Sequence, residues 1–266
     1  MHASPIAELL DPYIVGLTLP PGIYDQLSAY LDLLLRWNAK TNLTAIREPE
    51  QIATRHFGES LFAAGVLFGS EDFLRLSSRA NLEPKRGGVE EPALSLPKGP
   101  ASSDRRQPTT GPGAPSKPGV GLGGIRDAQA SGAALADLGS GAGFPGIPIK
   151  LAFPELHVTL IESQNKKATF LKEVIRTLKL DAIEVFNGRA EHWGRYADVV
   201  TLRAVERFES VLPVAARLVA PHGRLCLLVG DTFDPSAIPI ANLNWQTEIH
   251  VPGSERRKIL LGSRTS

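Results

Sequence analysis

A glycine-rich loop between an apolar strand and a helix is the feature that most restricts the fold of this chain. The strand is expected over Ala134–Leu138, and Gly139, Gly141 and Gly143 follow it directly. Glycine lets the backbone turn tightly there and approach a bound ligand closely. Pro145 suits the first turn of the helix that follows, because that turn does not use the N–H group that proline lacks. The arrangement is typical of open α/β sheets that bind a ligand at this loop.

Strands and helices alternate after the loop, which indicates a mostly parallel sheet with helices on both faces. The expected elements are helices over 147–152, 168–180 and 211–219 and strands over 157–161, 183–186, 197–202 and 224–229. Residues 246–251 and 258–261 flank Pro252-Gly253 and predict a closing hairpin. The predicted fold class is therefore α/β, a Rossmann-like sheet with a terminal antiparallel hairpin at its edge.

The first 72 residues have the periodicity of helices. Apolar residues recur at helical spacing over 23–35, and a second helix is expected from about 49 to 67. The polar residues 37–44 between them predict a turn. Residues 1–72 are therefore expected to form an N-terminal helical region that precedes the sheet.

A segment rich in proline and glycine separates the two regions. Residues 77–132 contain 8 of the 21 prolines and 10 of the 25 glycines and no aromatic residue, a composition typical of disordered segments. Long surface insertions are tolerated because the entropic cost of closing a loop grows slowly with its length. We expect a disordered insertion at 73–132, followed by the sheet domain at 133–266.

Composition limits the environment and the partners of the chain. The one cysteine, Cys226, cannot form a disulfide within the chain, which suits a reducing compartment. No stretch approaches the roughly 20 apolar residues of a membrane helix, and the N-terminus does not resemble a signal peptide. We therefore expect a soluble, cytoplasmic protein without a membrane partner. Because the formal net charge is only +1, RNA binding would need a local basic patch.

Two acidic residues beside the loop bear on the class of cofactor. Gly141 to Gly146 match the spacing with which dinucleotide folds seat a pyrophosphate, but that spacing alone is weak evidence. Asp137 stands two residues before the first glycine, where a carboxylate would repel a pyrophosphate and attract the amino group of a methionine moiety. Glu162 ends the next strand and is placed to accept hydrogen bonds from ribose hydroxyls. Asp137 thus favours S-adenosylmethionine over NAD, whereas Glu162 serves either cofactor.

Each of these acids also has a simpler interpretation. Asp137 could cap the glycine loop, and Glu162 could be a surface charge at the end of a strand. A third element follows the next strand, where Ala190 and Glu191 could present a backbone N–H and a side-chain acceptor to an adenine. An ordinary loop fits that segment by itself. In series, the three elements favour a class I S-adenosylmethionine-dependent methyltransferase.

Several longer segments share the pattern of one bacterial family. The segments are Leu35–Thr44, Arg55–Ser60, Asp137–Pro148, Gly188–Glu191, Asp198–Ala204 and Glu255–Arg257. Together they resemble the small-subunit (16S) ribosomal RNA methyltransferase G family, also called glucose-inhibited division protein B. The resemblance covers most of 20–72 and 133–262, and its most specific part is the Gly-Phe-Pro-Gly-Ile-Pro run that closes the glycine loop.

The resemblance implies an activity, a cofactor and a set of contacts. The family methylates N7 of a guanosine in the 530 loop of 16S rRNA, so the cofactor would be S-adenosyl-L-methionine and the partner 16S rRNA or the small ribosomal subunit. Arg55 and His56 would lie near the substrate mouth. We expect a monomer without a metal. With the residues argued above, the expected cofactor contacts are Asp137, Gly139, Gly141, Gly143, Phe144, Glu162, Ser163, Gln164, Ala190, Glu191 and Arg203.

The expected chemistry assigns no catalytic acid, base or nucleophile. N7 of guanine is a lone-pair nucleophile without a proton to remove, so catalysis would consist of in-line positioning against the sulfonium methyl group. Arg203, His56 and Arg55 are the positioning candidates. The simpler interpretations are a surface salt bridge for Arg203 and an Arg55–Glu59 pair at i,i+4 beside a packed histidine. Cys226 lies inside an apolar strand and is a poor nucleophile toward a pyrimidine ring.

Ten basic residues are candidates for contacts with RNA phosphates, which would make the affinity depend on salt. They are Arg36, Lys40, Arg47, Arg55, Lys166, Lys167, Arg203, Arg207, Arg256 and Arg257. Two positions depart from the family pattern: Glu59 replaces the usual Asp, and Val229 replaces the Lys of a Lys-Gly pair. Two alternatives therefore stay open. One is a decayed, non-catalytic homologue, and the other is a small-molecule methyltransferase of the same fold.

Overall fold

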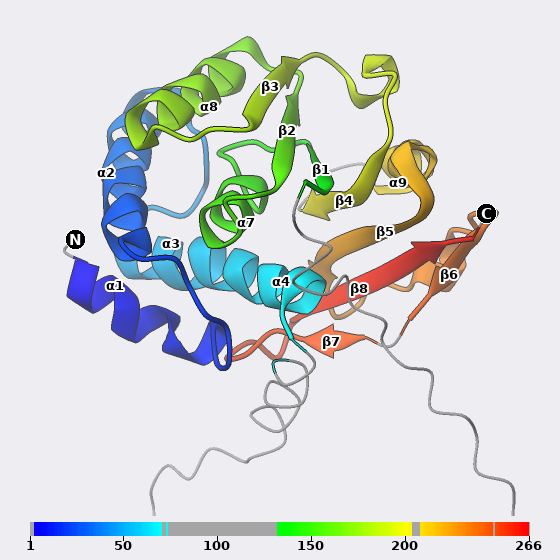
Figure 1. Cartoon of the computed structure of the whole chain (residues 1–266), viewed down its shortest axis with the longest axis horizontal. Helices are drawn as coiled ribbons and strands as arrows, with labels where there is room; N and C mark the ends of the chain where they lie inside the picture. The colour runs from blue at the N-terminus through cyan, green and yellow to red at the C-terminus, as the bar shows by residue number, and fades with distance from the viewer. Residues whose placement is uncertain (1–2, 71–72, 74–131, 204–207, 247, 266) are drawn as a thin grey trace, which may run out of the picture. The chain divides into compact units, whose positions relative to one another are not determined.

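The structure is a computed structural model that describes residues 3–70, 73, 132–203, 208–246 and 248–265 (Figure 1). The predicted insertion at 73–132 lies outside the described residues except for Phe73 and Gly132. The division of the chain into three regions stays a prediction.

The N-terminal region is helical, as its periodicity predicts. Its elements are α1 (Ala3–Leu10), the 3-10 helix η1 (Asp11–Tyr13), α2 (Ile23–Thr41), α3 (Pro49–Ile52), the π-helix η2 (Ala53–Gly58) and α4 (Glu59–Phe68).

Helix α2 is longer than its apolar pattern predicts, because the expected polar turn at 37–44 is half helical. Trp37 packs on Phe170 with 5.6 Å between the ring centroids. Asn38 is buried and its side chain exchanges hydrogen bonds with the backbone of Thr44. Tertiary contacts of polar and aromatic residues therefore carry the helix to Thr41, and Asn42 ends it in a left-handed conformation.

The second region alternates strands and helices and ends in three antiparallel strands. Its elements are β1 (Ala134–Leu138), α7 (Gly146–Ala152), β2 (His157–Glu162), α8 (Asn165–Leu178), β3 (Ile183–Asn187), η3 (Ala190–His192), β4 (Ala197–Arg203), α9 (Phe208–Leu218), β5 (Val219–Gly230), η4 (Pro235–Ala237), β6 (Leu243–Trp245), β7 (Ile249–His250) and β8 (Arg257–Arg264).

The strands form one sheet in the order β3-β2-β1-β4-β5-β8-β6, and β7 also pairs with β8. Strands β1 to β5 are parallel, whereas β8 is antiparallel to β5. The predicted α/β class, with its mostly parallel sheet and its β7–β8 hairpin, is confirmed. The antiparallel edge also contains the short strand β6, which the sequence analysis did not predict and which pairs with β8. Strands β2 and β3 lie on one side of β1, and β4 and β5 lie on its other side. Such a reversal of strand order opens a crevice at the carboxyl ends of the strands.

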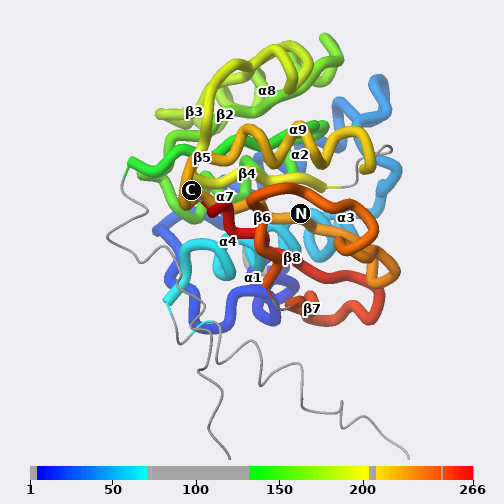
Figure 2. The backbone as a smooth tube through the Cα atoms, turned by 90° about the vertical axis from the view of Figure 1, so that its right-hand side faces the viewer, coloured from blue at the N-terminus to red at the C-terminus, as the bar shows by residue number. Residues whose placement is uncertain are grey.

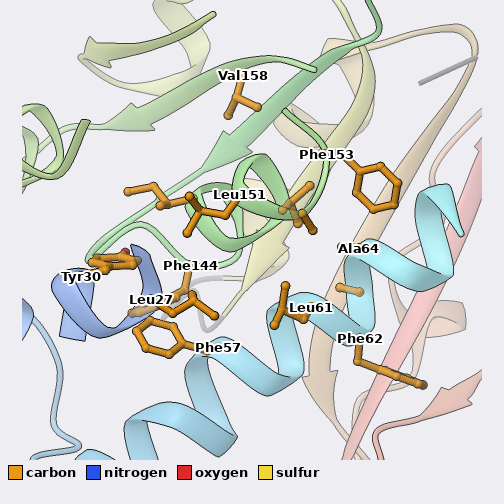
Figure 3. Close-up of a cluster of buried hydrophobic side chains, with 14 of the residues drawn as sticks. Leu27, Tyr30, Phe57, Leu61, Phe62, Ala64, Phe144, Leu151, Phe153 and Val158 are labelled. Atoms are coloured by element: carbon orange, nitrogen blue, oxygen red, sulfur yellow. The ribbon is translucent and has the colours of Figure 1, made fainter. Parts of the chain in front are cut away.

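The N-terminal helices and one face of the sheet share a hydrophobic core. Figure 3 shows Tyr30 of α2 and Phe57 and Leu61 of the η2–α4 helix gathered around Phe144 and Leu151. The opposite face of the sheet is covered mainly by α9. Helix α4 also lies beside β8 in both overall views (Figures 1 and 2). Because burying one large apolar side chain contributes about 1.5–3 kcal/mol, we expect the N-terminal helices and the sheet to unfold together.

Candidate active site

The glycine loop is hydrogen-bonded to the end of the neighbouring strand. The backbone N–H groups of Gly139 and Ser140 both donate to the carbonyl of Ile161 on β2, at 2.9 and 3.1 Å. These bonds place the loop at the carboxyl ends of β1 and β2.

Helix α2 of the N-terminal region braces the same loop. The Tyr30 hydroxyl is buried and donates to the carbonyl of Ala142. At Gly143 the backbone has φ +94°, and a Cβ there would lie 2.5 Å from both the Tyr30 hydroxyl and the Ile147 side chain. Only glycine therefore fits, and the loop conformation depends on α2 as well as on the sheet.

A pocket of about 200 Å³ opens beside the loop. Four residues predicted to contact the cofactor line it: Gly139, Ser163, Ala190 and Glu191. The rest of the lining was not predicted to contact the cofactor, and it consists of Leu138, Ile161, Gly188, Arg189, Val211 and Val214. Val211 and Val214 stand three residues apart on α9, a spacing that puts them on one helix face. Their periodicity predicts a buried face but does not tell which crevice that face closes.

Asp137 caps the glycine loop, and its expected contact with a methionine amino group stays a prediction. Its side chain is fully buried, and its two oxygens accept hydrogen bonds from the Thr201 hydroxyl at 2.8 Å and the Gly146 N–H at 3.2 Å. Burial raises the pKa of this carboxyl from 3.8 to about 6. The carboxylate therefore ties β1 to β4 and to the start of α7.

Replacing Asp137 with Asn should change how stability depends on pH. A folded-state pKa raised from 3.8 to about 6 means that the carboxyl stabilises the fold below pH 4 and that this contribution is lost as pH rises to 6. The free energy of unfolding of the variant, relative to the native protein, should therefore rise by roughly 3 kcal/mol over that window and level off above it. Urea unfolding of both proteins between pH 4 and 7 measures the difference. A difference that is flat or falls with pH would contradict the prediction.

Glu162 is oriented toward the loop and retains capacity to bind a ligand. Its two oxygens accept from the backbone N–H groups of Gly141 at 3.0 Å and Gln164 at 2.8 Å. Because a carboxylate offers about four lone-pair sites, each oxygen can accept one more hydrogen bond. The residue is not the freely exposed strand-end charge of the simpler interpretation, since it is only 5% exposed.

A buried ionic cluster lies where the N-terminal helices meet the ends of β4 and β8. Nη2 of Arg203 donates to Oε2 of Glu59 at 3.0 Å and to the backbone carbonyl of Arg55. Nη1 of Arg257 donates to the same Glu59 oxygen at 2.9 Å. The side chains of Arg203 and Glu59 are 6% and 4% exposed. Burial lowers the pKa of Arg203 to about 10, so the guanidinium stays charged at neutral pH.

The cluster replaces the Arg55–Glu59 pair that helical spacing suggested. Residues 53–58 form a π-helix, whose wider turn changes the spacing expected for an α-helix. Glu59 then pairs with Arg203 and Arg257 instead. Arg203 is not a surface salt bridge either, because it is buried.

Phe144 connects the glycine loop to this cluster. Its ring stacks on that of His56, with centroids 4.5 Å apart and planes 19° apart. The Arg203 guanidinium lies 6.0 Å from the Phe144 ring centroid. Burial, and then the charge of Arg203, lower the pKa of His56 to about 3, so this histidine is neutral at neutral pH. The structure thus brings His56, Phe144 and Arg203 together at the end of the glycine loop, whereas Arg55 is exposed.

A lysine does stand beside Val229, the position where the family pattern has a lysine. Lys258 is the direct partner of Val229 in the pairing of β5 with β8. Its Nζ donates to Glu248 at 2.7 Å, and the residue is 4% exposed. Strand spacing within the sequence does not reveal this neighbour, because the register of two distant strands sets it.

Most of the basic candidates for RNA contact have accessible side chains. The exposed ones are Arg36, Lys40, Arg47, Arg55, Lys166 and Arg256. Arg203 is buried, and Arg207 lies outside the described residues. Within the described ranges, no group of three or more His, Cys, Asp or Glu side chains could hold a metal ion. No helix in the part of the chain that the structure describes is long and apolar enough to cross a membrane.

Comparison with known families gives a match over more than half of the chain. The model of the family described as GidB, rRNA small subunit methyltransferase G, matches residues 23–75 and 124–237. Those ranges leave out residues 76–123, the greater part of the segment rich in proline and glycine.

Three proteins named ribosomal RNA small subunit methyltransferase G illustrate the similarity. That of Stenotrophomonas maltophilia (strain K279a) is 30% identical over 93% of this chain and 90% of its own length. That of Chloroflexus aggregans is 30% identical over 92% of this chain and 84% of its own length. For Bacillus subtilis the identity is 28%, over 78% of this chain and 64% of the relative.

Solved structures resemble about half of the chain. A mutant of MtNAS in complex with S-adenosylmethionine has a TM-score of 0.45 and 18% identity, over 51% of this chain and 56% of that one. TrmN from Thermus thermophilus has a TM-score of 0.43 and 15% identity, over 50% and 44% of the two chains.

Proposed function

Because the chain belongs to the rRNA small subunit methyltransferase G family, we propose that it methylates N7 of a guanosine in the 530 loop of 16S rRNA. Methyl transfer from S-adenosylmethionine to small-subunit rRNA is the activity of the family, and the fold is that of a class I methyltransferase. The nucleotide and the atom are the finer part of the proposal. The proposal also includes that the protein acts as a monomer on the small subunit or on its rRNA.

The residues of the crevice fit the cofactor. When bound, S-adenosylmethionine supplies an electrophilic methyl group on a sulfonium sulfur. Glu162 holds the glycine loop at Gly141 and has lone pairs left for the ribose hydroxyls. The apolar side chains of Leu138, Ile161 and Val211 line the pocket and suit an adenine ring, and Glu191 adds an acceptor at its rim.

The protonation state of the groups around Phe144 is the observation that carries the choice of N7. An exocyclic amine or a hydroxyl must lose a proton when it attacks a methyl group, so it needs a general base. Glu59 is engaged by two arginines, Asp137 is fully buried and holds Thr201 and Gly146, and His56 is a very weak base with a pKa of about 3. No side chain of this cluster, within the described residues, is therefore available as a base. N7 requires none.

The exposed basic residues support RNA as the substrate. Arg55 lies on the helix that carries His56, and Arg256 precedes the strand that carries Arg257. Both side chains are exposed beside the buried cluster, where phosphate groups of an RNA could reach them. Such contacts would make the affinity fall as salt rises.

The test is methyl transfer from labelled S-adenosylmethionine to small-subunit particles that lack the modification, with N7 sites mapped by chemical cleavage. The proposal predicts a single N7-methylguanosine in the 530 loop. Cofactor binding without transfer would instead identify a decayed homologue. Transfer to a small molecule in the absence of rRNA would identify the small-molecule methyltransferase. Methylation at another atom or nucleotide would overturn the finer part of the proposal alone.

A further inference from the structure

Among the described residues, two buried nitrogen atoms beside Phe144 lack a hydrogen-bond partner. They are Nη1 of Arg203 and Nδ1 of His56, each with less than 1 Å² of accessible surface. A buried polar group left unpaired costs about 1–3 kcal/mol, so such atoms call for an explanation. Since both residues lie against the ring of Phe144 in the glycine loop, a ligand bound at this loop is the natural source of partners.

The hydrogen bonds of His56 assign the proton of its ring. Nε2 of His56 lies 2.8 Å from the Thr44 hydroxyl oxygen, which already accepts the N–H of Ile46 at 3.2 Å. We assign the hydroxyl proton to Nε2, because the hydrogen bonds of the described residues offer it no other acceptor, and Nε2 is then an acceptor. In the neutral ring the other nitrogen then carries the hydrogen. Nδ1 is thus a neutral N–H donor.

The two unpartnered donors differ in charge, so we expect them to bind different kinds of acceptor. Arg203 is a cation and suits an anionic acceptor such as a carboxylate or a phosphate. His56 is surrounded by the charges of Arg203, Arg257 and Arg55 and is neutral. A neutral N–H donor can pair with a neutral acceptor such as a carbonyl oxygen, and the cations around it favour the partial negative charge of that oxygen.

We propose that the Nδ1–H group of His56 donates a hydrogen bond to O6 of the target guanine and thereby makes His56 a specificity-determining residue. The inference rests on the proposed function, since it requires a guanine beside Phe144. Adenine carries an amino group at the same position. That amino group would face the Nδ1–H donor as a second donor, and both would stay unpaired. Sites built to hydrogen-bond one group reject analogues that lack it.

A substrate analogue and a leucine variant can test this contact together. The substrate is a small subunit reconstituted with 16S rRNA that carries 2-aminopurine in place of the target guanosine, because 2-aminopurine keeps N7 and lacks O6. The native protein should methylate it roughly 10- to 100-fold more slowly than guanosine, measured as kcat/KM. His56→Leu should show a similar loss on guanosine and no further loss on 2-aminopurine.

Two further variants separate recognition from folding. His56→Asn retains an N–H donor near the position of Nδ1 and should recover a large part of the preference for guanosine. His157→Asn, at the exposed start of β2, is the matched control and should behave as the native protein. The dissociation constant of S-adenosylmethionine should be unchanged in His56→Leu.

Three outcomes would overturn the inference. Equal rates of the native protein on guanosine and 2-aminopurine would show that O6 is not read. Equal losses of His56→Leu on both substrates would show that the side chain acts elsewhere. If His56→Leu binds S-adenosylmethionine more weakly and loses the same rate on guanosine and on 2-aminopurine, the Nδ1–H group donates to the cofactor and not to O6. A native protein inactive on guanosine particles would instead overturn the proposed function, and this inference with it.

Discussion

Replacing Glu59 with alanine should lower the free energy of unfolding by roughly 3–5 kcal/mol, the range measured when one partner of a buried ion pair is removed. The Glu59 carboxylate accepts from both Arg203 and Arg257, and it is 4% exposed. Its removal leaves a buried guanidinium without a counter-charge and disconnects α4 from β4 and β8. Urea unfolding followed by circular dichroism measures the loss, together with the midpoint of thermal unfolding.

Two comparisons make this prediction specific. Glu173→Ala removes the carboxylate of an exposed i,i+3 pair with Arg176 and should leave the midpoint unchanged, because exposed pairs contribute little. Glu59→Asp keeps the charge on a shorter side chain and should fall between the alanine variant and the native protein. If Glu59→Ala unfolds at nearly the native midpoint, water reaches the two arginines and the cluster does not hold the layers together.

Replacing Glu162 with alanine should raise the dissociation constant of S-adenosylmethionine by roughly 10- to 100-fold, since each hydrogen bond to a charged group contributes about 1.5–3 kcal/mol. The variant removes the proposed acceptor of the ribose hydroxyls. It also releases the N–H groups of Gly141 and Gln164, which hold the loop in shape. The fold should persist because both N–H groups belong to loops, where they can bond to water instead. Calorimetric titration measures the affinity.

The control for this variant is a carboxylate near the amino end of the neighbouring strand. Glu184 lies on β3 and pairs with the exposed Arg195, so Glu184→Ala should bind the cofactor as the native protein does. An unchanged dissociation constant for Glu162→Ala would remove Glu162 from the site. If Glu162→Ala does not fold, Glu162→Gln tests the same point, because its carbonyl oxygen retains one acceptor.

Local patterns in the sequence were sufficient for the fold class and for the family. The strand at 134–138 was predicted with its observed bounds and β2, β3 and β4 to within one residue, whereas β5 begins at Val219 and not at 224 as predicted. Apolar strand segments, helical periodicity and the glycine loop depend on residues that are close in the sequence, so a short stretch is enough to predict them. The predicted cofactor residues Gly139, Ser163, Ala190 and Glu191 line one pocket for the same reason: they follow the carboxyl ends of consecutive strands. Their contact with the cofactor stays a prediction.

The tertiary structure decided what those residues do beside one another. Asp137 is a loop cap because Thr201, from a strand 64 residues away, reaches its carboxylate. Glu59 binds Arg203 and Arg257, which lie 144 and 198 residues away, and not the nearby Arg55 that α-helical spacing suggested. Partners at such separations leave no periodic signal, because their distance depends on how the layers pack. The sequence by itself thus determined the sheet, the loop and the family, whereas packing alone decided the buried cluster and the unpaired donor of His56 that faces it.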